Sequence, residues 1–230
     1  SIEERNELLD KYPESEKYIK PFIGSYEFIN GKNRYCLWLK GISPAEYRGI
    51  PEIMERLNGV ADTRRKTKTV AVQAQAETPM LFSQIRQPDS NYLAIPEVSS
   101  EKRRYIPIGF MTPNIIASNK LYLVPKADLY MLGVMISNVH MAWMRAVCGR
   151  LKSDYSYSPA VYNNFPWPAP TDGQKAKIEQ TAQAILDVRT LYSDRSLADL
   201  YDEIAMPPEL RKAHQQNDRA VMHAYGFDVA

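Results

Sequence analysis

Residues 128–149 read DLYMLGVMISNVHMAWMRAVCG, and this stretch decides the fold. Its apolar run from 129 to 144 is sixteen residues long and contains Asn138 and His140, whereas a helix needs about 20 apolar residues to cross a bilayer. Asp128 can cap a helix at its start, and Gly149 can end it near Cys148. We therefore expect one long helix buried in a soluble protein, and no membrane segment.

Short β-rich runs precede that helix. YLAIPEV (92–98), RYIPIGF (104–110) and KLYLV (120–124) are separated by Ser, Lys, Arg, Pro and Asn, as in a mostly antiparallel sheet. Further upstream, two apolar-aromatic runs flank Asn30-Gly31, a dipeptide that tolerates the positive φ angles of a tight turn. We predict a hairpin formed by residues 25–29 and 34–39.

Helices are expected on both sides of this block. Residues 2–10 look helical, and Ser43-Pro44 can begin a helix over 44–66 that Gly49-Ile50-Pro51 can break. After APTDG (169–173), apolar residues recur at helical spacing to the end of the chain. The predicted fold class is α+β: a mixed, mostly antiparallel sheet domain packed on a long buried helix, followed by a small all-helical C-terminal module.

Charge is distributed unevenly along the chain. The net charge of +2 divides into −1 for residues 1–59, +6 for 60–170 and −3 for 171–230. A local basic excess of this kind can bind a polyanion, although solvated surface residues can also produce it.

Composition also bears on the compartment. Of 230 residues, 44% are apolar and 24% are charged, which fits a globular chain with a real core. Cys36 and Cys148 each lie in an apolar run and are expected to be buried thiols, which favours a reducing, cytoplasmic setting. The first residues lack the basic and apolar parts of a signal peptide, so we expect none, and a start inside a longer protein is possible.

The octapeptide VYNNFPWP (161–168) is close to the Asn-Pro-Pro-aromatic tetrapeptide with which amino-methyltransferases hold a flipped base. Here Asn164 is followed by Phe165-Pro166-Trp167-Pro168, so the order is wrong. A methyltransferase also needs a glycine-rich cofactor turn, and the sequence contains none. We interpret the octapeptide as an extended junction between two domains, anchored by Asn163, Phe165 and Trp167.

Other catalytic signatures are absent from the sequence. There is no phosphate-binding glycine loop, no HExxH and no paired-cysteine metal motif. His140, His214 and His223 are far apart in sequence, which favours satisfied structural histidines over metal ligands. Pro88-Asp89 followed by Glu101-Lys102 only faintly matches the carboxylates and lysine of a metal-dependent nuclease.

Three basic clusters remain as candidate sites, and we expect them on one subdomain. They are interleaved with side chains that donate and accept hydrogen bonds, the types that neutralise phosphates and read base edges. GRLKSDYSYSP (149–159) is the most suggestive segment, because a polar loop is expected there directly after the helix. The clusters are Arg64, Arg65, Lys66 and Lys68; Lys102, Arg103 and Arg104; and Arg145, Arg150 and Lys152.

Longer segments carry a resemblance to a known family. They are KPFIGSYEFINGKNRYCLWL, ETPMLFSQIRQP, YLAIPEVSSEKRRYIPIGF, ASNKLYLVPKADLYMLGVMISNVHMAWMRAVCGRLKSDYSYSPAVYNNFPWP and PPELRKAHQQNDRAVMHAYGF, and the most specific parts are MAWMRAVCGRLKSDY and NNFPWP. In these segments the chain resembles the C-terminal part of the MmeI-like DNA methyltransferases, the type IIL restriction-modification family. In that family a nuclease region and an N6-adenine methyltransferase domain precede a target recognition domain and a helical C-terminal domain.

The resemblance implies a domain plan and a set of partners. Residues 1–20 would be a helical linker from an upstream domain, 21–168 the target recognition domain, and 169–230 the C-terminal helical domain. The implied partners are double-stranded DNA and the methyltransferase domain, with a nuclease domain possible, of the same polypeptide in a bacterial cytoplasm. No cofactor is expected in this chain, because S-adenosylmethionine would bind the catalytic domain outside it.

The implied function is sequence-specific DNA target recognition, without catalysis by this chain alone. By position, Asn119, Lys120, Lys152 and Asp154 match the family's base-reading loops. The predicted DNA-binding set is Arg64, Arg65, Lys66, Lys68, Ser99, Lys102, Arg103, Arg104, Asn119, Lys120, Arg150, Lys152, Asp154 and Tyr155. Two alternatives stay open: a protein–protein interaction module of a larger assembly, and a stand-alone enzyme.

Overall fold

A computed structural model describes residues 1–228 and divides them into two compact units. The N-terminal unit comprises residues 1–22, 33–87 and 114–116, and the C-terminal unit comprises residues 23–32, 88–113 and everything from 117 onward. Each unit has its own hydrophobic core. In the described part of the chain, no helix has the length and apolar character needed to cross a membrane.

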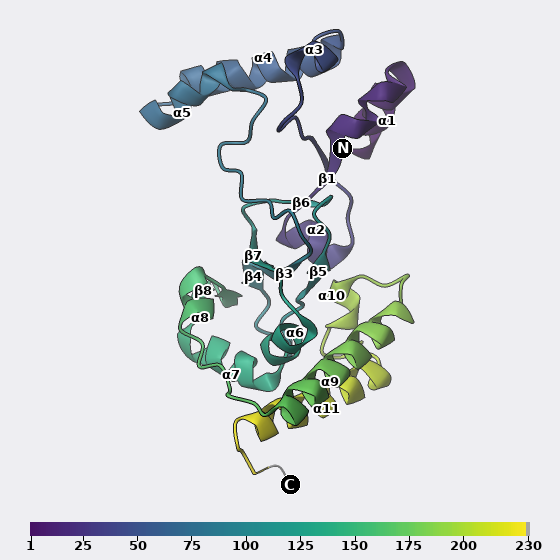
Figure 1. Ribbon diagram of the computed structural model, residues 1–230, viewed down its shortest axis with the longest axis vertical. Helices are drawn as coiled ribbons and strands as arrows, with labels where there is room; N and C mark the ends of the chain where they lie inside the picture. Colours follow the sequence, from purple (N-terminus) through teal and green to yellow (C-terminus); the bar gives the residue numbers. More distant parts are fainter. Residues whose placement is uncertain (229–230) are drawn as a thin grey trace. The chain divides into compact units, whose positions relative to one another are not determined.

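The N-terminal unit is mainly helical (Figure 1). A core of Leu8, Tyr18, Leu39, Tyr47, Ile50, Ile53 and Leu57 holds it together. Its strands belong to a sheet of order β2-β1-β6, in which β1 and β2 are antiparallel. Its elements are α1 (Ile2–Lys11), the 3-10 helix η1 (Pro13–Tyr18), β1 (Ile19–Ile23), β2 (Tyr35–Leu37), α3 (Pro44–Tyr47), α4 (Pro51–Lys66), α5 (Val70–Ala74) and η2 (Gln75–Glu77), with β6 (Ile116–Ala117) at the boundary.

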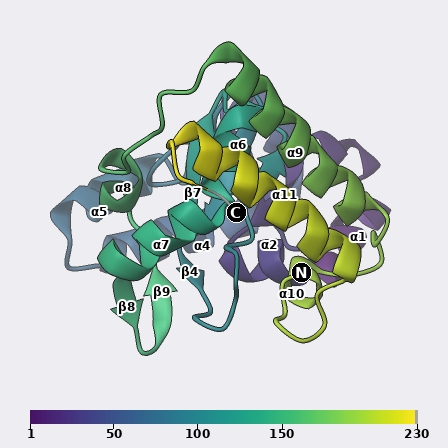
Figure 2. The same ribbon diagram turned by 90° about the horizontal axis from the view of Figure 1, so that it is seen from below.

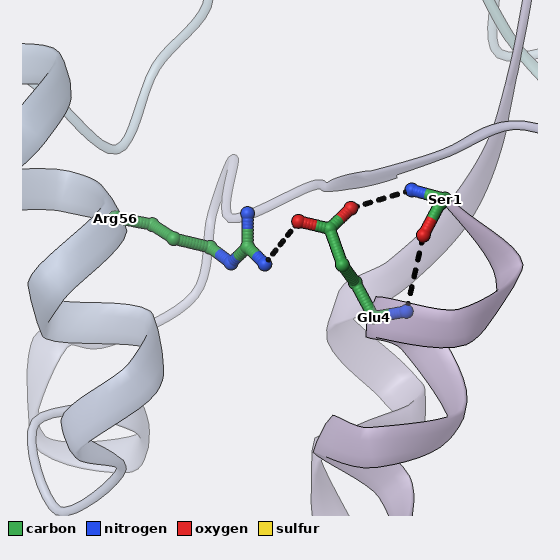
Figure 3. Close-up of polar contacts among 3 residues, drawn as sticks. All are labelled: Ser1, Glu4 and Arg56. Carbon is green, nitrogen blue, oxygen red and sulfur yellow. Dashed lines mark hydrogen bonds and ion pairs between the residues drawn. The ribbon is translucent and has the colours of Figure 1, made fainter.

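Exposed ion pairs tie α1 to α4 in this unit. Figure 3 shows Glu4 between the amino group of Ser1, at 2.6 Å, and Arg56 of α4, at 3.0 Å. These two hydrogen bonds, that of Ser1 first, lower the pKa of Glu4 to about 2. Lys11 and Glu52 form a second bridge at 3.0 Å. Each exposed ion pair of this kind adds little to the free energy of unfolding, so the small apolar core provides most of the stability of the unit.

The C-terminal unit is α+β, as predicted, and its sheets are small. One has the order β5-β3-β7 and the other β4-β9-β8, and every strand pair in them is antiparallel. Helix α9 packs along α11 and α6 (Figure 2). The elements are α2 (Ser25–Asn30), β3 (Tyr92–Pro96), β4 (Val98–Ser99), β5 (Gly109–Met111), β7 (Leu121–Pro125), α6 (Leu129–Met135), α7 (Asn138–Val147), β8 (Gly149–Leu151), β9 (Asp154–Ser156), α8 (Pro159–Asn163), α9 (Asp172–Thr190), α10 (Leu197–Leu200) and α11 (Pro208–Ala224).

The predicted hairpin at 25–39 is wrong in its first strand. Residues 25–30 form α2, and Gly31 ends it with φ 61°. The Glu27 carboxylate accepts from the Gly24 N–H at 2.8 Å and so starts the helix. A left-handed glycine serves a helix C-cap as well as a hairpin turn, so Asn30-Gly31 could not distinguish them. Tyr35–Leu37 is a strand, but it pairs with β1.

The long helix predicted over 128–148 is two helices. Asp128 caps α6 by accepting from the Met131 N–H at 2.8 Å, as expected. Ser137 then interrupts the run: its hydroxyl donates to the Val134 carbonyl at 2.7 Å and accepts from the His140 N–H at 3.4 Å, which caps α7. The apolar pattern hid this cap because residues on both sides of it are buried. The predicted break near Gly49-Ile50-Pro51, between α3 and α4, is confirmed.

Candidate nucleic-acid interface

The sheet β4-β9-β8 brings two of the three basic clusters together. Ser99 pairs with Tyr155, and Tyr155 pairs with Arg150, across the three strands. The segment after β4 stays on this sheet, because the Glu101 N–H donates to the Asp154 carboxylate at 3.2 Å. Residues 102–104, here called the basic loop, therefore lie in the same small region as the turn between β8 and β9.

The segment GRLKSDYSYSP is a β-hairpin, which corrects the expected open loop. Strands β8 and β9 enclose a tight turn in which Lys152 has φ 56°, an uncommon angle for a residue with a side chain. Arg150 donates to the Ser153 carbonyl at 2.9 Å, and its guanidinium lies 4.1 Å from the centre of the Tyr155 ring. Leu151 and Lys152 are exposed at the turn. The hairpin thus presents its polar residues on a fixed backbone.

The pair Asn119 and Lys120 lies beside β4. The Glu97 N–H donates to the Lys120 carbonyl at 3.0 Å, and the Ser25 hydroxyl contacts the same oxygen. Lys120 Nζ lies 2.8 Å from the Glu97 carboxylate, whose hydrogen bond raises the pKa of Lys120. Asn119 is exposed. The segment is therefore fixed by Glu97 and Ser25 close to the sheet that carries the hairpin.

The predicted site residues differ in exposure. Lys102, Arg104, Asn119, Lys120, Arg150 and Lys152 are exposed. Arg103 is half-buried between Asp154 and Asp202, and burial lowers its pKa while the two carboxylates oppose that effect. Ser99 and Tyr155 are only 3% and 5% exposed. These two support the sheet, whereas the exposed residues can reach a ligand.

The first basic cluster lies in the N-terminal unit, so the expectation of one subdomain for all three clusters is wrong. Its residues end α4 and lead into α5. Arg64 donates to the carbonyls of Gln75, Thr78 and Leu81 at 2.7–2.9 Å. Arg65 pairs with Asp62 at 3.0 Å, whereas Lys66 and Lys68 are exposed. Arg64 is therefore engaged in holding the chain that follows.

The octapeptide VYNNFPWP is only partly the extended segment expected, because its first three residues belong to helix α8 (Pro159–Asn163). Phe165 is 5% exposed and packs edge-on against His140 and Trp143, with ring centroids 5.0 and 6.2 Å away. The hydroxyl of Tyr225, the residue directly after α11, donates to the Pro166 carbonyl at 2.6 Å. The packing predicted for Phe165 and Trp167 is confirmed. Asn163, however, is exposed, and Asn164 donates to the Ala160 carbonyl at 2.8 Å instead.

Two of the three histidines are buried in the core. His140 lies 3.0 Å from the Tyr157 hydroxyl, and His214 lies 2.7 Å from that of Tyr201. Burial lowers the pKa of His140 to about 4 and that of His214 well below its usual value, so both are neutral at neutral pH. Residues 1–228 contain no cluster of three or more His, Cys, Asp and Glu side chains that could hold a metal ion.

The comparisons with known proteins agree with this geometry. The family model for the MmeI target recognition domain matches residues 1–169, and the model for the MmeI C-terminal domain matches residues 170–230. The chain belongs to the MmeI family. It carries that family's target recognition domain followed by its C-terminal domain, so the resemblance noted from the sequence is confirmed.

Two relatives of this MmeI-family chain are longer than the chain itself. The structure of the type IIL restriction-modification enzyme MmeI in complex with DNA has a TM-score of 0.96 and 47% identity, over 99% of this chain and 31% of that one. DNA methyltransferase A of Bacillus subtilis (strain 168) is 40% identical over 226 residues, which are 98% of this chain and 26% of the relative. The chain therefore spans about a quarter to a third of the length of these relatives.

The two family domains do not coincide with the two compact units. The target recognition domain supplies the whole N-terminal unit and also much of the C-terminal unit, which it shares with the C-terminal domain. Sequence reasoning did not identify the contacts across this shared part, among them Tyr105 with Asp218. Asp218 lies in an amphipathic helix rich in charged residues, so nothing in the sequence marked it as buried.

Proposed function

We propose that this chain binds double-stranded DNA and recognises the target sequence for a DNA adenine-N6 methyltransferase of the restriction-modification class. The family match over the whole chain and the similarity to a protein solved with DNA support the proposal. The observation that supports it most strongly is the β4-β9-β8 sheet, in which the basic loop lies beside a hairpin with exposed Arg150 and Lys152 and a half-buried Asp154. Catalysis would take place in another domain of the same polypeptide, which would also bind S-adenosylmethionine.

Two kinds of contact are expected at this site. Lys102, Arg104 and Arg150 have cationic side chains suited to contacts with phosphates. Contacts of this kind position a protein on the duplex. Asn119, Lys152 and Asp154 offer donors and an acceptor of the types that read base edges in the major groove. Asp154 is half-buried and already accepts from Glu101, so its carboxylate has a defined orientation. We propose that these three side chains contribute to sequence choice.

The first test is a salt titration of DNA binding. Fluorescence anisotropy with a labelled duplex should show log affinity falling linearly with log salt, by about 0.9 for each phosphate neutralised. Replacing Lys102, Arg104 and Lys152 together by Glu should weaken binding by more than about tenfold, because attraction to phosphates becomes repulsion.

A matched control makes the same change in net charge at three cations outside the proposed site. Lys177, Lys212 and Arg219 are exposed residues of α9 and α11. Replacing these three by Glu changes the net charge equally, and binding should stay within about threefold of the unmodified chain at physiological salt, because the proposed phosphate contacts remain and salt screens the other charges. Equal losses in the two triple variants, or a salt-independent affinity of the unmodified chain, would contradict the proposed site.

A further inference from the structure

The segment between the basic loop and β5, residues 105–108, is held by helices of the C-terminal domain. Tyr105, Ile106 and Ile108 are at most 1% exposed. Three residues beyond 169 contact this segment directly: Asp218 and His214 contact Tyr105, and Arg189 contacts the Ile108 carbonyl. The C-terminal domain thus holds residues 105–108 in place, directly after the basic loop that we assign to DNA binding.

Asp218 of α11 makes the first contact. Its carboxylate accepts from the Tyr105 hydroxyl, the Asn138 backbone N–H and the Asn138 side-chain amide, each at 2.7 Å. The carboxylate is nearly buried, and burial raises the pKa of Asp218 against the effect of these bonds. Because a buried carboxylate is costly without donors, this arrangement tolerates little displacement of Tyr105.

Arg189 of α9 makes the second contact. Its guanidinium donates to the Ile108 carbonyl at 2.7 Å, and its Nε donates to the Tyr201 hydroxyl at 2.9 Å. That hydroxyl lies 2.7 Å from His214 Nε2, and the His214 ring stacks on Tyr105 with centroids 4.0 Å apart. The contacts therefore form a closed circuit that fixes both ends of residues 105–108.

We propose that Tyr105, Arg189 and Asp218 are positioning residues for DNA binding. Tyr105 is the next residue after Arg104, whose guanidinium lies 5.9 Å from the Tyr105 ring centre. Arg103 likewise lies near Asp202, another residue of the C-terminal domain. The C-terminal domain sets the direction in which the basic loop leaves the core, so DNA affinity depends on side chains that do not touch DNA. This inference rests on the proposed function.

Two substitutions test it without changing the net charge. Tyr105→Phe removes one hydroxyl and keeps the ring stacked on His214. Arg189→Lys keeps the charge and loses the simultaneous donation to the Ile108 carbonyl and the Tyr201 hydroxyl. Each should weaken binding of a labelled duplex by about fivefold, in the range of couplings measured through packed networks. Affinities are compared at a temperature where circular dichroism shows every variant folded.

Thr181→Val is the matched control for destabilisation. The Thr181 hydroxyl donates to Asn217 at 2.9 Å in the same contact between α9 and α11, but it does not touch residues 105–108. It should lower the melting temperature and leave DNA affinity unchanged. If Thr181→Val weakens DNA binding as much as Tyr105→Phe does, the effect is general destabilisation and the inference fails.

A double-mutant cycle separates positioning from a merely structural role. With Arg104→Ala already present, adding Tyr105→Phe should cost little further affinity, because the cation that it positions is gone. Full additivity, or unchanged affinity in both charge-conserving variants, overturns the inference while the proposed function stands. If the unmodified chain shows no salt-dependent DNA binding, the proposed function fails and the inference fails with it.

Discussion

The runs RRKTK (64–68) and GRLKSD (149–154) both contain clustered cations, yet the two units use these cations differently. In the N-terminal unit, Arg64 binds three backbone carbonyls and Arg65 pairs with Asp62. In the C-terminal unit, a hairpin presents Arg150 and Lys152 at an exposed turn beside the basic loop. A cluster of cations is therefore a candidate binding site where its side chains stay exposed, as Lys152 does, and a poorer one where several backbone carbonyls take up their donors, as around Arg64.

The units also differ in what stabilises them. The N-terminal unit combines a small core with exposed ion pairs, whereas the C-terminal unit buries histidines, an aspartate and an asparagine in a larger core. Buried polar groups respond more strongly to substitution and pH than exposed ones do. Hydrogen exchange followed separately in α4 and in α6 can measure this difference.

The largest expected effect is loss of stability of the C-terminal unit in mild acid. Because burial lowers the pKa of His140 to about 4, from an ordinary 6.5, the unfolded chain binds a proton between these values and the folded chain does not. The neutral, buried His140 therefore contributes on the order of 3 kcal/mol to the free energy of unfolding above pH 6.5, and this contribution is lost as the pH falls toward 4. Exchange protection in α7 measured between pH 7 and 4 checks this.

The N-terminal unit should respond only at lower pH. The hydrogen bond from Lys11 lowers the pKa of Glu52 of α4 from 4.5, so the contribution of Glu52 is present above pH 4.5 and is lost as pH falls through its lowered pKa. His140→Gln, which removes one of the two buried imidazoles and leaves His214, should make the pH dependence of the C-terminal unit shallower above pH 4 and leave α4 unaffected. A steep loss of α4 protection between pH 6.5 and 4.5 would contradict the contrast between the units.

The next effect is that of adding one methyl group to a helical glycine in each unit. A Cβ at Gly133 of α6 would lie 2.6 Å from Ile178 Cγ2 and 3.1 Å from Asn217 Oδ1, whereas Gly59 of α4 has open space. Gly133→Ala should destabilise the C-terminal unit by about 2–3 kcal/mol through overpacking. Gly59→Ala should stabilise α4 by about 0.5–1 kcal/mol. Equal effects of both, measured by thermal unfolding, would show that α6 can shift away from α9.

The smallest effect compares the two arginines directly. Arg64→Met should lower the stability of the N-terminal unit by about 1–2 kcal/mol, because three carbonyls lose a charged donor. Arg150→Met should leave stability within about 0.5 kcal/mol and weaken DNA binding instead, since its guanidinium is exposed. Denaturant titration of both variants measures the change in stability, and fluorescence anisotropy with labelled DNA measures the change in affinity. If Arg150→Met proves the more destabilising, the assignment of roles is wrong.

Local signals in the sequence predicted a large part of the architecture. The α+β class, the antiparallel pairing, the break between α3 and α4 and the helices after residue 170 followed from periodicity, proline positions and capping residues. The family was recognisable from contiguous segments such as NNFPWP. The DNA-contacting role of individual residues stays a prediction, because exposure alone does not determine which side chains bind.

Where a local signal fits two structures, the sequence was insufficient. Gly31 has a positive φ that suits a helix end or a hairpin, and Ser137 can sit within a helix or cap the next one. The strand predicted over 104–110 shortens to Gly109–Met111, because residues 105–108 bond to helices more than eighty residues away in the sequence. The sequence around residues 105–108 gives no indication of these contacts with α9 and α11.

The sequence by itself determined the elements and the family, because these depend on the spacing of apolar residues and on contiguous motifs. Only the tertiary structure decided which cations hold the fold and which are exposed: Arg64 binds three backbone carbonyls, whereas Arg150 is exposed on a hairpin strand. It also decided that Asp218 is a buried acceptor for Tyr105 and Asn138. The reason is that the desolvation and pairing of a charge depend on all the groups that surround it after folding, whatever their distance along the chain.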